Sequence, residues 1–151
     1  MTATVRLERF EPVPFAAVRR RTNFPQVPAA LIAGLDDVWT FIRARSIAHG
    51  HNVAVYRKLA GEDVEMTCGV TVTAPFTGAG EIIFAATPAG LAATAVHVGP
   101  YADMGETYDA IAGSAGHQGL APAGVNWEVY GDWQSDPALL ETTLHMLVGK
   151  T

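Results

Sequence analysis

The stretch AVHVGPYADMGETYDAI, residues 95–111, contains the change of structure that decides the fold. It begins as an apolar run typical of a β-strand, and its second part has the apolar spacing of an α-helix. The tripeptide Gly99-Pro100-Tyr101 separates the two parts, and glycine followed by proline favours a sharp turn over a continued strand. The sequence therefore predicts a strand that leads through a tight turn directly into a helix.

The same order of elements is predicted twice along the chain. Two strand-like runs at 5–23, and two at 81–99, are each joined by a turn that contains proline, which indicates a hairpin. Two further strand-like runs follow each predicted helix, at 52–72 and at 126–148. Each helix has apolar residues at i, i+4, i+7 and i+11; these are Leu31, Leu35, Val38 and Ile42 in the first and Met104, Tyr108, Ile111 and Ala115 in the second.

These repeats predict an α+β fold made of duplicated β-β-α-β-β halves. We expect a single domain over residues 1–151, with pseudo-repeats at about 4–73 and 80–149 and a linker at about 74–80. Because neither half alone has enough apolar surface for a stable core, we expect the halves to form one pseudo-twofold antiparallel sheet. Two helices would cover one face of this sheet, and a ligand cleft would lie on the other.

The composition narrows the possible partners. The net charge is −5 and no basic cluster occurs beyond Arg19–Arg21, so we expect no direct nucleic-acid binding. No apolar run approaches the length of a membrane-spanning helix, and the N-terminus lacks the apolar core of a signal peptide. Cys68 is the only cysteine, which favours a reducing compartment. We therefore expect a cytoplasmic protein with a small-molecule partner and no membrane contact.

The motifs of common enzymes and metalloproteins are missing. The sequence has no phosphate-binding glycine loop and no HExxH. Ala112–Gly116 resembles a nucleophile elbow only loosely, since it falls at a predicted helix end. His49 and His51 have no third ligand at a telling spacing, and Cys68 is expected to be a buried, unreactive thiol. We predict no metal, no cofactor and no catalytic residue.

Alternation divides the last strand of each half into an apolar side and a polar side. We expect the apolar side to face the helices, and the apolar character of Trp127 and Val129 assigns them to it. The other face is either a solvated sheet or a cleft, and tyrosines beside carboxylates favour the cleft. This polar face collects Tyr56, Glu65, Thr67, Glu128, Tyr130, Glu141, Thr143 and His145.

Several pieces of the sequence together resemble the effector-binding domain family, also called GyrI-like after a gyrase-inhibitory protein. They are Pro88–Gly90, His97–Tyr101, Leu120–Gly124, Trp127–Tyr130 and the last strand. The family occurs in AraC-type and multidrug-binding MerR-type regulators, and the resemblance covers nearly the whole chain. It implies a duplicated α+β fold with a small-molecule pocket at the pseudo-twofold, and it puts His97 and Tyr101 at the pocket rim.

The resemblance also suggests which residues would bind a ligand. Relatives that bind organic cations commonly carry a deep glutamate on the last strand, where this chain has Thr143. With Glu128 and Glu141 at the rim, we expect weak discrimination between a cationic aromatic ligand and a neutral one. The candidate ligand-binding residues are Tyr130, Glu128, Trp127, His97, Tyr101, Thr143, Glu141, His145, Tyr56 and Thr67.

Three functions follow from these expectations, and we favour binding over catalysis. The first is a sensor or scavenger of an aromatic or lipophilic compound, which we expect to be stand-alone, without a DNA-binding region before or after the domain. A separate regulator protein would then be a second partner. The second, implied by some stand-alone relatives, is hydrolysis of strained electrophilic compounds, with Glu128, Tyr130 and Trp127 activating water. The third is a protein-interaction module such as a gyrase inhibitor.

Overall fold

The structure, a computed structural model, describes residues 4–150 and confirms the α+β class. Its described residues form eight strands and two α-helices in the order β1-β2-α1-β3-β4-β5-β6-α2-β7-β8, which is the predicted order. The chain divides into two compact units, one of residues 12–87 and the other of residues 1–11 with 88–151. Within each unit the strands pair in antiparallel fashion.

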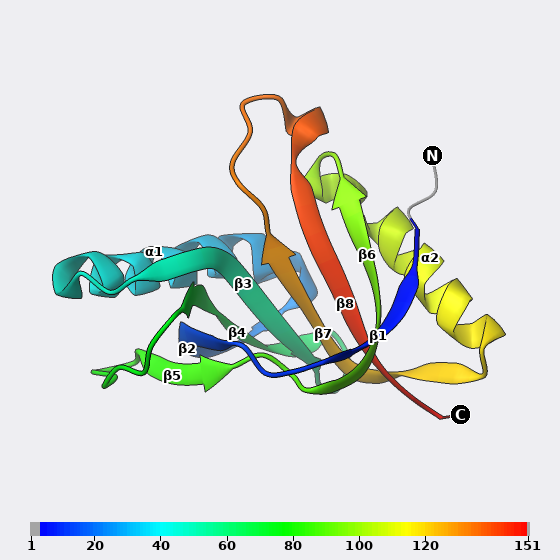
Figure 1. The fold of residues 1–151 in the computed structure, drawn as a ribbon, viewed down its shortest axis with the longest axis horizontal. Coiled ribbons are helices and arrows are strands. Elements are labelled where there is room, and N and C mark those ends of the chain that lie inside the picture. The colour runs from blue at the N-terminus through cyan, green and yellow to red at the C-terminus, as the bar shows by residue number, and fades with distance from the viewer. Residues whose placement is uncertain (1–3, 151) are drawn as a thin grey trace. The chain divides into compact units, whose positions relative to one another are not determined.

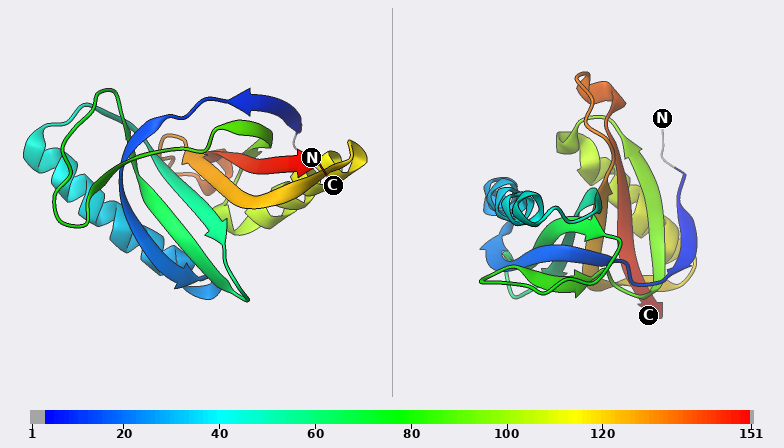
Figure 2. Two further views of the ribbon diagram at one scale, coloured as in Figure 1. Left: turned by 90° about the horizontal axis from the view of Figure 1, so that it is seen from below. Right: turned by 60° about the vertical axis from the view of Figure 1, so that its left-hand side comes forward.

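The unit of residues 12–87 contains four strands in the order β3-β4-β2-β5. α1 (Val27–Arg45) lies along one face of them, against β2 and β4 (Figure 2). The 3-10 helix η1 (Phe24–Gln26) directly precedes α1. The strands are β2 (Pro14–Asn23), β3 (His49–Lys58), β4 (Asp63–Val72) and β5 (Ile83–Ala86).

α1 packs closely on β4 because a glycine faces the strand. A Cβ atom at Gly34 would lie 2.5 Å from Sγ of Cys68, so no larger residue fits there without rearrangement. Cys68 therefore lies on the α1 side of β4, as the alternation predicted. Burial raises the pKa of the Cys68 thiol to about 11, which agrees with the predicted unreactive thiol.

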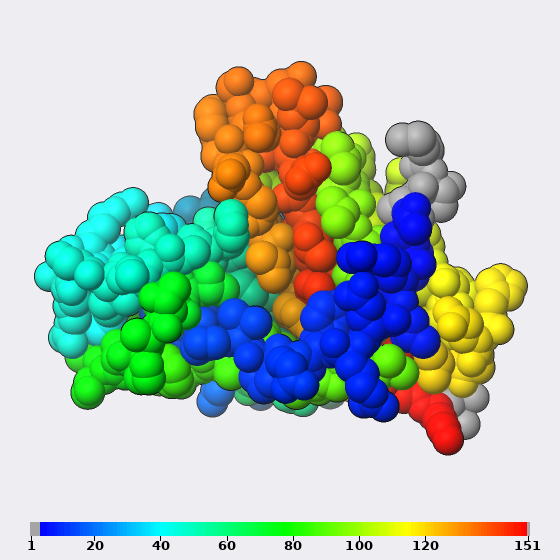
Figure 3. All heavy atoms as spheres, in the orientation of Figure 1, coloured from blue at the N-terminus to red at the C-terminus, as the bar shows by residue number. Residues whose placement is uncertain are grey.

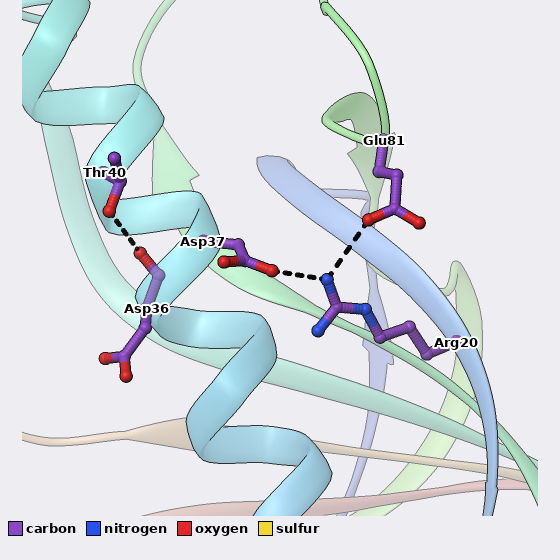
Figure 4. Close-up of polar contacts among 5 residues, drawn as sticks. All are labelled: Arg20, Asp36, Asp37, Thr40 and Glu81. Carbon is purple, nitrogen blue, oxygen red and sulfur yellow. Dashed lines mark hydrogen bonds and ion pairs between the residues drawn. The ribbon is translucent and has the colours of Figure 1, made fainter.

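Arg20 ties β2 to two other segments of this unit. Its guanidinium donates to Asp37 of α1 at 2.6 Å and to Glu81 at 3.4 Å, and Figure 4 shows the side chain lying between the two carboxylates. Both carboxylates are more than half exposed to solvent. Ion pairs of this kind contribute about 0–1 kcal/mol, so this network is a modest contribution to stability.

The other unit also has four strands, in the order β1-β6-β8-β7, and Figure 1 shows α2 (Met104–His117) beside them. The strands are β1 (Arg6–Phe10), β6 (Gly90–Val98), β7 (Leu120–Tyr130) and β8 (Glu141–Lys150). Two 3-10 helices, η2 (Tyr101–Asp103) and η3 (Pro137–Leu139), lie in its connections. Its buried apolar cluster joins α2 to β6 and β8 and consists of Ala93, Ala95, Ile111, Ala115, Leu144, Met146 and Val148.

The two hairpins predicted at 5–23 and 81–99 do not form. β1 pairs with β6, whereas β2 pairs with β4 and β5. Proline-containing turns signal that a strand ends, but they do not fix which strand it pairs with. The first strand of each sequence half therefore belongs to the unit that contains most of the other half.

The connection between β7 and β8 stands out from its unit. Figure 3 shows residues of this segment, in orange, extending beyond the neighbouring strands. Trp133 in this segment is 80% exposed and Leu139 is 57% exposed.

Neither α1 nor α2, the helices that residues 4–150 contain, is both long and apolar enough to cross a membrane.

Candidate functional site

A buried carboxylate on β7 is the centre of the candidate site. Glu128 is only 5% exposed, and its two oxygens accept hydrogen bonds from the hydroxyls of Tyr108 and Tyr130, at 2.7 and 2.5 Å. Burial raises the pKa of the Glu128 carboxyl above its ordinary value, and the bonds from Tyr130 and Tyr108 oppose that rise. A carboxylate that is costly to desolvate is thus held by two neutral hydroxyl donors.

A third tyrosine extends this arrangement towards solvent. The ring of Tyr101 lies edge-on to the ring of Tyr130, with 5.8 Å between centroids and 78° between planes. Tyr101 is 46% exposed, whereas Tyr130 is 8% exposed. We call Glu128 with Tyr101, Tyr108 and Tyr130 the Glu128 cluster. It combines one buried carboxylate with three aromatic rings, of which that of Tyr101 is the most exposed.

The tripeptide Gly99-Pro100-Tyr101, which follows β6, positions Tyr101 in this cluster. Gly99 has φ of +128°, a conformation that residues with a side chain rarely adopt, and its N–H donates to the carbonyl of Leu140 at 2.8 Å. Pro100 then leads the chain into η2. The predicted strand, sharp turn and helix are therefore confirmed at the predicted place.

Glu128 and Tyr130 lie on the side of β7 that faces α2, and their predicted place on the opposite face is wrong. In the β7–β8 register Glu128 is opposite Leu144 and Tyr130 is opposite Thr142, while the Tyr108 hydroxyl of α2 reaches Glu128. Directly opposite residues share a face, and Leu144 belongs to the cluster packed on α2. The prediction used the apolar character of Trp127, but strand register decides the face. The predicted rim position of Glu128 is also wrong, because the residue is buried.

Trp127 and His145 lie together on the other face of the same strands. They are opposite each other in the register, and their rings stack with 4.6 Å between centroids. The ring of Phe10 from β1 lies edge-on to both, at 5.6 Å from Trp127 and 4.7 Å from His145. Trp127 therefore does not join Glu128, and its predicted place on the helix side is wrong.

Two of the predicted residues on β8, Thr143 and Glu141, do not join the Glu128 cluster. Thr143 is opposite Val96 and Val129, on the face of Trp127, and Glu141 is an exposed residue at the start of β8. Thr67 and Tyr56 belong to the unit of residues 12–87. Tyr56 is opposite Met66 in the β3–β4 register. Met66 and Cys68 lie on the same face of β4, and Cys68 faces α1, so the predicted place of Tyr56 away from the helix is wrong.

The sequence analysis did not identify Tyr108 as a site residue. It was assigned only to the apolar stripe of the helix, and its ring does pack on the buried apolar cluster. A tyrosine in such a stripe carries a hydroxyl that needs a partner when it is buried, and this signal could have identified Tyr108.

Within residues 4–150 no group of three histidine, cysteine or acidic residues could hold a metal ion.

Two polar side-chain atoms in this unit are buried without a hydrogen-bond partner among the described residues. They are Oγ1 of Thr142 and Nδ1 of His145. Thr142 lies on β8 between His97 of β6 and Tyr130 of β7, so it is beside the Glu128 cluster. His145 lies on the opposite face with Trp127. Burial and, to a smaller extent, the positive charge of Arg6 together lower the pKa of the His145 imidazole to about 4.

The described residues thus form an α+β domain with a buried carboxylate held by tyrosines. The chain belongs to the GyrI-like family, because the family model for the GyrI-like small molecule binding domain matches residues 3–144. This confirms the resemblance found in the sequence. Among curated proteins, none matches the sequence.

Solved structures show the same fold. The EcmrR C-terminal domain matches with a TM-score of 0.80 and 21% identity over 100% of both chains, and in an EcmrR–DNA complex the chain spans 59% of EcmrR. A hydrolase from Listeria innocua matches with a TM-score of 0.66 and 10% identity over 98% of this chain and 93% of that one. SAV2435 bound to tetraphenylphosphonium matches with a TM-score of 0.64 and 9% identity over 97% and 94%.

Proposed function

We propose that this GyrI-like domain binds a lipophilic organic cation with aromatic groups at the Glu128 cluster, and acts as a sensor or scavenger of such compounds. The observation that carries the proposal is the state of Glu128. Its carboxyl is 5% exposed and is bonded by two tyrosine hydroxyls, and no described cationic side chain forms an ion pair with it. A buried carboxylate without a counter-charge is stabilised when a cation arrives.

The three tyrosines account for a preference for lipophilic cations over small inorganic ones. A cation over an aromatic ring gains about 0.5–2 kcal/mol, with the larger values in desolvated sites. Tyr101 is exposed enough to contact a ligand at the surface. The ring of Tyr130 contacts that of Tyr101, and its hydroxyl bonds Glu128, so Tyr130 links the surface to the carboxylate. An organic cation also loses less hydration free energy than a metal ion when it leaves water.

Two structural neighbours support this proposal. One is the C-terminal domain of EcmrR, a protein also solved in complex with DNA, and the other is SAV2435 bound to tetraphenylphosphonium. Their identities with this chain are 21% and 9%, so they support the scaffold and the class of ligand, and the choice of residues rests on the Glu128 cluster.

Titration calorimetry with two ions of similar size and opposite charge tests the proposal. The weak charge discrimination expected from the sequence assumed a carboxylate at the rim, and Glu128 is buried. We therefore expect tetraphenylphosphonium to bind at least about tenfold more tightly than tetraphenylborate. Glu128→Gln keeps the shape of the side chain and removes its charge, so it should weaken cation binding by about tenfold or more. Glu141→Gln, which changes an exposed carboxylate, is the matched control and should bind as the unmodified protein does. Equal affinity for both ions would refute a role for the carboxylate.

Hydrolysis of a strained electrophilic compound is a second candidate, and one observation favours it. A buried carboxyl with a raised pKa beside two hydroxyl groups has the properties of a general acid or base. A neighbour of similar fold is described as a hydrolase. Mass spectrometry would detect the addition of one water to a cyclopropane-containing electrophile, at a rate that Glu128→Gln abolishes. Trp127 would have no part in this reaction, since it lies on the other face.

A further inference from the structure

His97 on β6 has both ring nitrogens occupied by groups of its own unit. Nδ1 lies 2.8 Å from Oγ1 of Thr107 in α2, and Nε2 lies 2.9 Å from the carbonyl oxygen of Pro100. The residue is 5% exposed. Its ring therefore has no free polar atom for a ligand, although the sequence suggested a ligand contact at this position.

The chemistry of the carbonyl partner fixes one hydrogen position of this bridge. A backbone carbonyl only accepts, so the hydrogen must be on Nε2. Nδ1 shares the second hydrogen bond with the Thr107 hydroxyl, which can act as donor or acceptor. The carbonyl of Pro100 thus sets the tautomer of the imidazole, while Thr107 holds the orientation of the ring, and the imidazole in turn holds the carbonyl of Pro100. This is the relation by which a second hydrogen bond orients a functional histidine in other sites.

The residue held in this way directly precedes Tyr101. β6 ends at Val98, and the chain reverses its direction at Gly99, so the position of Tyr101 depends on how Pro100 is fixed. The N–H of Gly99 also ties this turn to the β8 side, through its bond to the carbonyl of Leu140. The His97 bridge adds the connection to α2, the helix that also carries Tyr108.

We propose that His97 is a positioning residue of the binding site: through Pro100 it holds Tyr101 against Tyr130, and Thr107 keeps its ring in the orientation that does so. This inference rests on the proposed function only in its consequence for ligand affinity. The geometric part, from Thr107 through His97 to the ring contact of Tyr101 with Tyr130, stands on the described bonds alone.

Ligand binding gives the first test, with tetraphenylphosphonium as the probe in titration calorimetry. His97→Leu and Thr107→Val should each weaken binding by about fivefold or more, while Thr107→Ser, which keeps the hydroxyl, should stay within about twofold. In a Tyr101→Ala background the His97→Leu change should cost less than about twofold, because the residue that it positions is gone. His117→Gln, at the exposed end of α2, is the control and should have no effect.

A ligand-free measurement keeps the inference testable if the probe does not bind. Ring protons of Tyr101 and Tyr130 should show a nuclear Overhauser contact in the unmodified protein and in Thr107→Ser, and this contact should be lost in Thr107→Val. A contact that persists in both Thr107→Val and His97→Leu would overturn the inference, as would a full affinity loss in the Tyr101→Ala background. Loss of the contact without any probe binding would refute the proposed function and leave the positioning role supported.

Discussion

Glu128 is the residue whose ionisation should control ligand binding. Its two hydrogen bonds come from tyrosine hydroxyls, which stabilise the ionised form, yet burial outweighs them and the pKa is raised. A bound cation would favour the ionised form, so it would lower this pKa, and binding would then release a proton wherever the free protein is protonated. Cation affinity and the charge of Glu128 are therefore linked.

The first prediction is a pH dependence of cation binding with a defined sign. Affinity for tetraphenylphosphonium should rise as the pH rises through the raised pKa of Glu128, in a range above the ordinary value of 4.5, and then level off. Calorimetry in buffers of different ionisation enthalpy should detect proton release in that range. Glu128→Gln should bind weakly at every pH. An affinity that falls with rising pH would contradict this linkage.

The second prediction concerns His145 and stability. Its folded-state pKa of about 4 is below the ordinary value of 6.5, so between these two values the unfolded chain takes up a proton and the folded chain does not. The free energy of unfolding should therefore fall as the pH falls from about 6.5 to about 4, by up to about 3 kcal/mol. Neighbouring Arg6 acts in the same direction, since its charge repels the imidazolium.

Denaturant titrations at several pH values measure this dependence. His145→Phe keeps an aromatic ring between Trp127 and Phe10 and removes the titrating group, so the fall in this pH range should largely disappear. His117→Gln, which changes an exposed histidine, should keep it. If His145→Phe shows the same fall as the unmodified protein, then other groups cause the pH dependence.

At the scale of elements, the sequence predicted each strand and helix better than the faces that they present. The alternation around Trp127 and Glu128 correctly separated two sets of side chains. It could not decide which set faces α2, because that depends on the register of β7 with β8, which the alternation along one strand does not contain. The apolar Trp127 therefore suggested the wrong face. A buried glutamate on the helix side is possible here because Tyr108 and Tyr130 satisfy its oxygens, and such pairing is not visible in a pattern of polar and apolar letters.

The third prediction tests the turn that ends β6. Gly99→Ala places a side chain at φ of +128°, so it should lower the free energy of unfolding by about 1–3 kcal/mol. Gly113→Ala is the matched control, because this glycine lies within α2 and a Cβ there meets no atom within 4 Å. It should raise stability by about 0.5–1 kcal/mol, through the helix propensity of alanine. Thermal unfolding measures both, and equal effects would show that the turn is not strained.

At the scale of the whole chain, the two halves predicted from the sequence repeat do not coincide with the two compact units of the structure. The repeat predicted halves at about 4–73 and 80–149, but β1 from the first half pairs with β6, and β5 from the second half pairs with β2. Local signals locate strands, whereas these pairings join residues distant in sequence and depend on the packing of the finished fold. Residues 12–87 thus form one unit inserted between two pieces of the other.

The connection between the units predicts how the chain unfolds. The ends of the inserted unit are held together by two bonds, from the N–H of Val13 to Oγ1 of Thr87 at 2.8 Å and from the N–H of Thr87 to the carbonyl of Val13 at 2.9 Å. While residues 12–87 are folded, β1 and β6 leave from neighbouring points. If that unit unfolds, the pairing of β1 with β6 must close it as a flexible loop, which costs roughly 4 kcal/mol by the loop-length relation.

The fourth prediction is therefore a single calorimetric transition. A loop cost of that size is comparable with the whole stability that one small core supplies, so β1 should not stay paired with β6 after residues 12–87 have unfolded. The calorimetric and van't Hoff enthalpies should agree. Thr87→Val removes the acceptor of the Val13 N–H and should lower stability by about 1–3 kcal/mol while the transition stays single. Two resolved transitions in the unmodified protein would mean that β1 holds its place on β6 without the folded insertion, and that the loop cost estimated for residues 12–87 is too large.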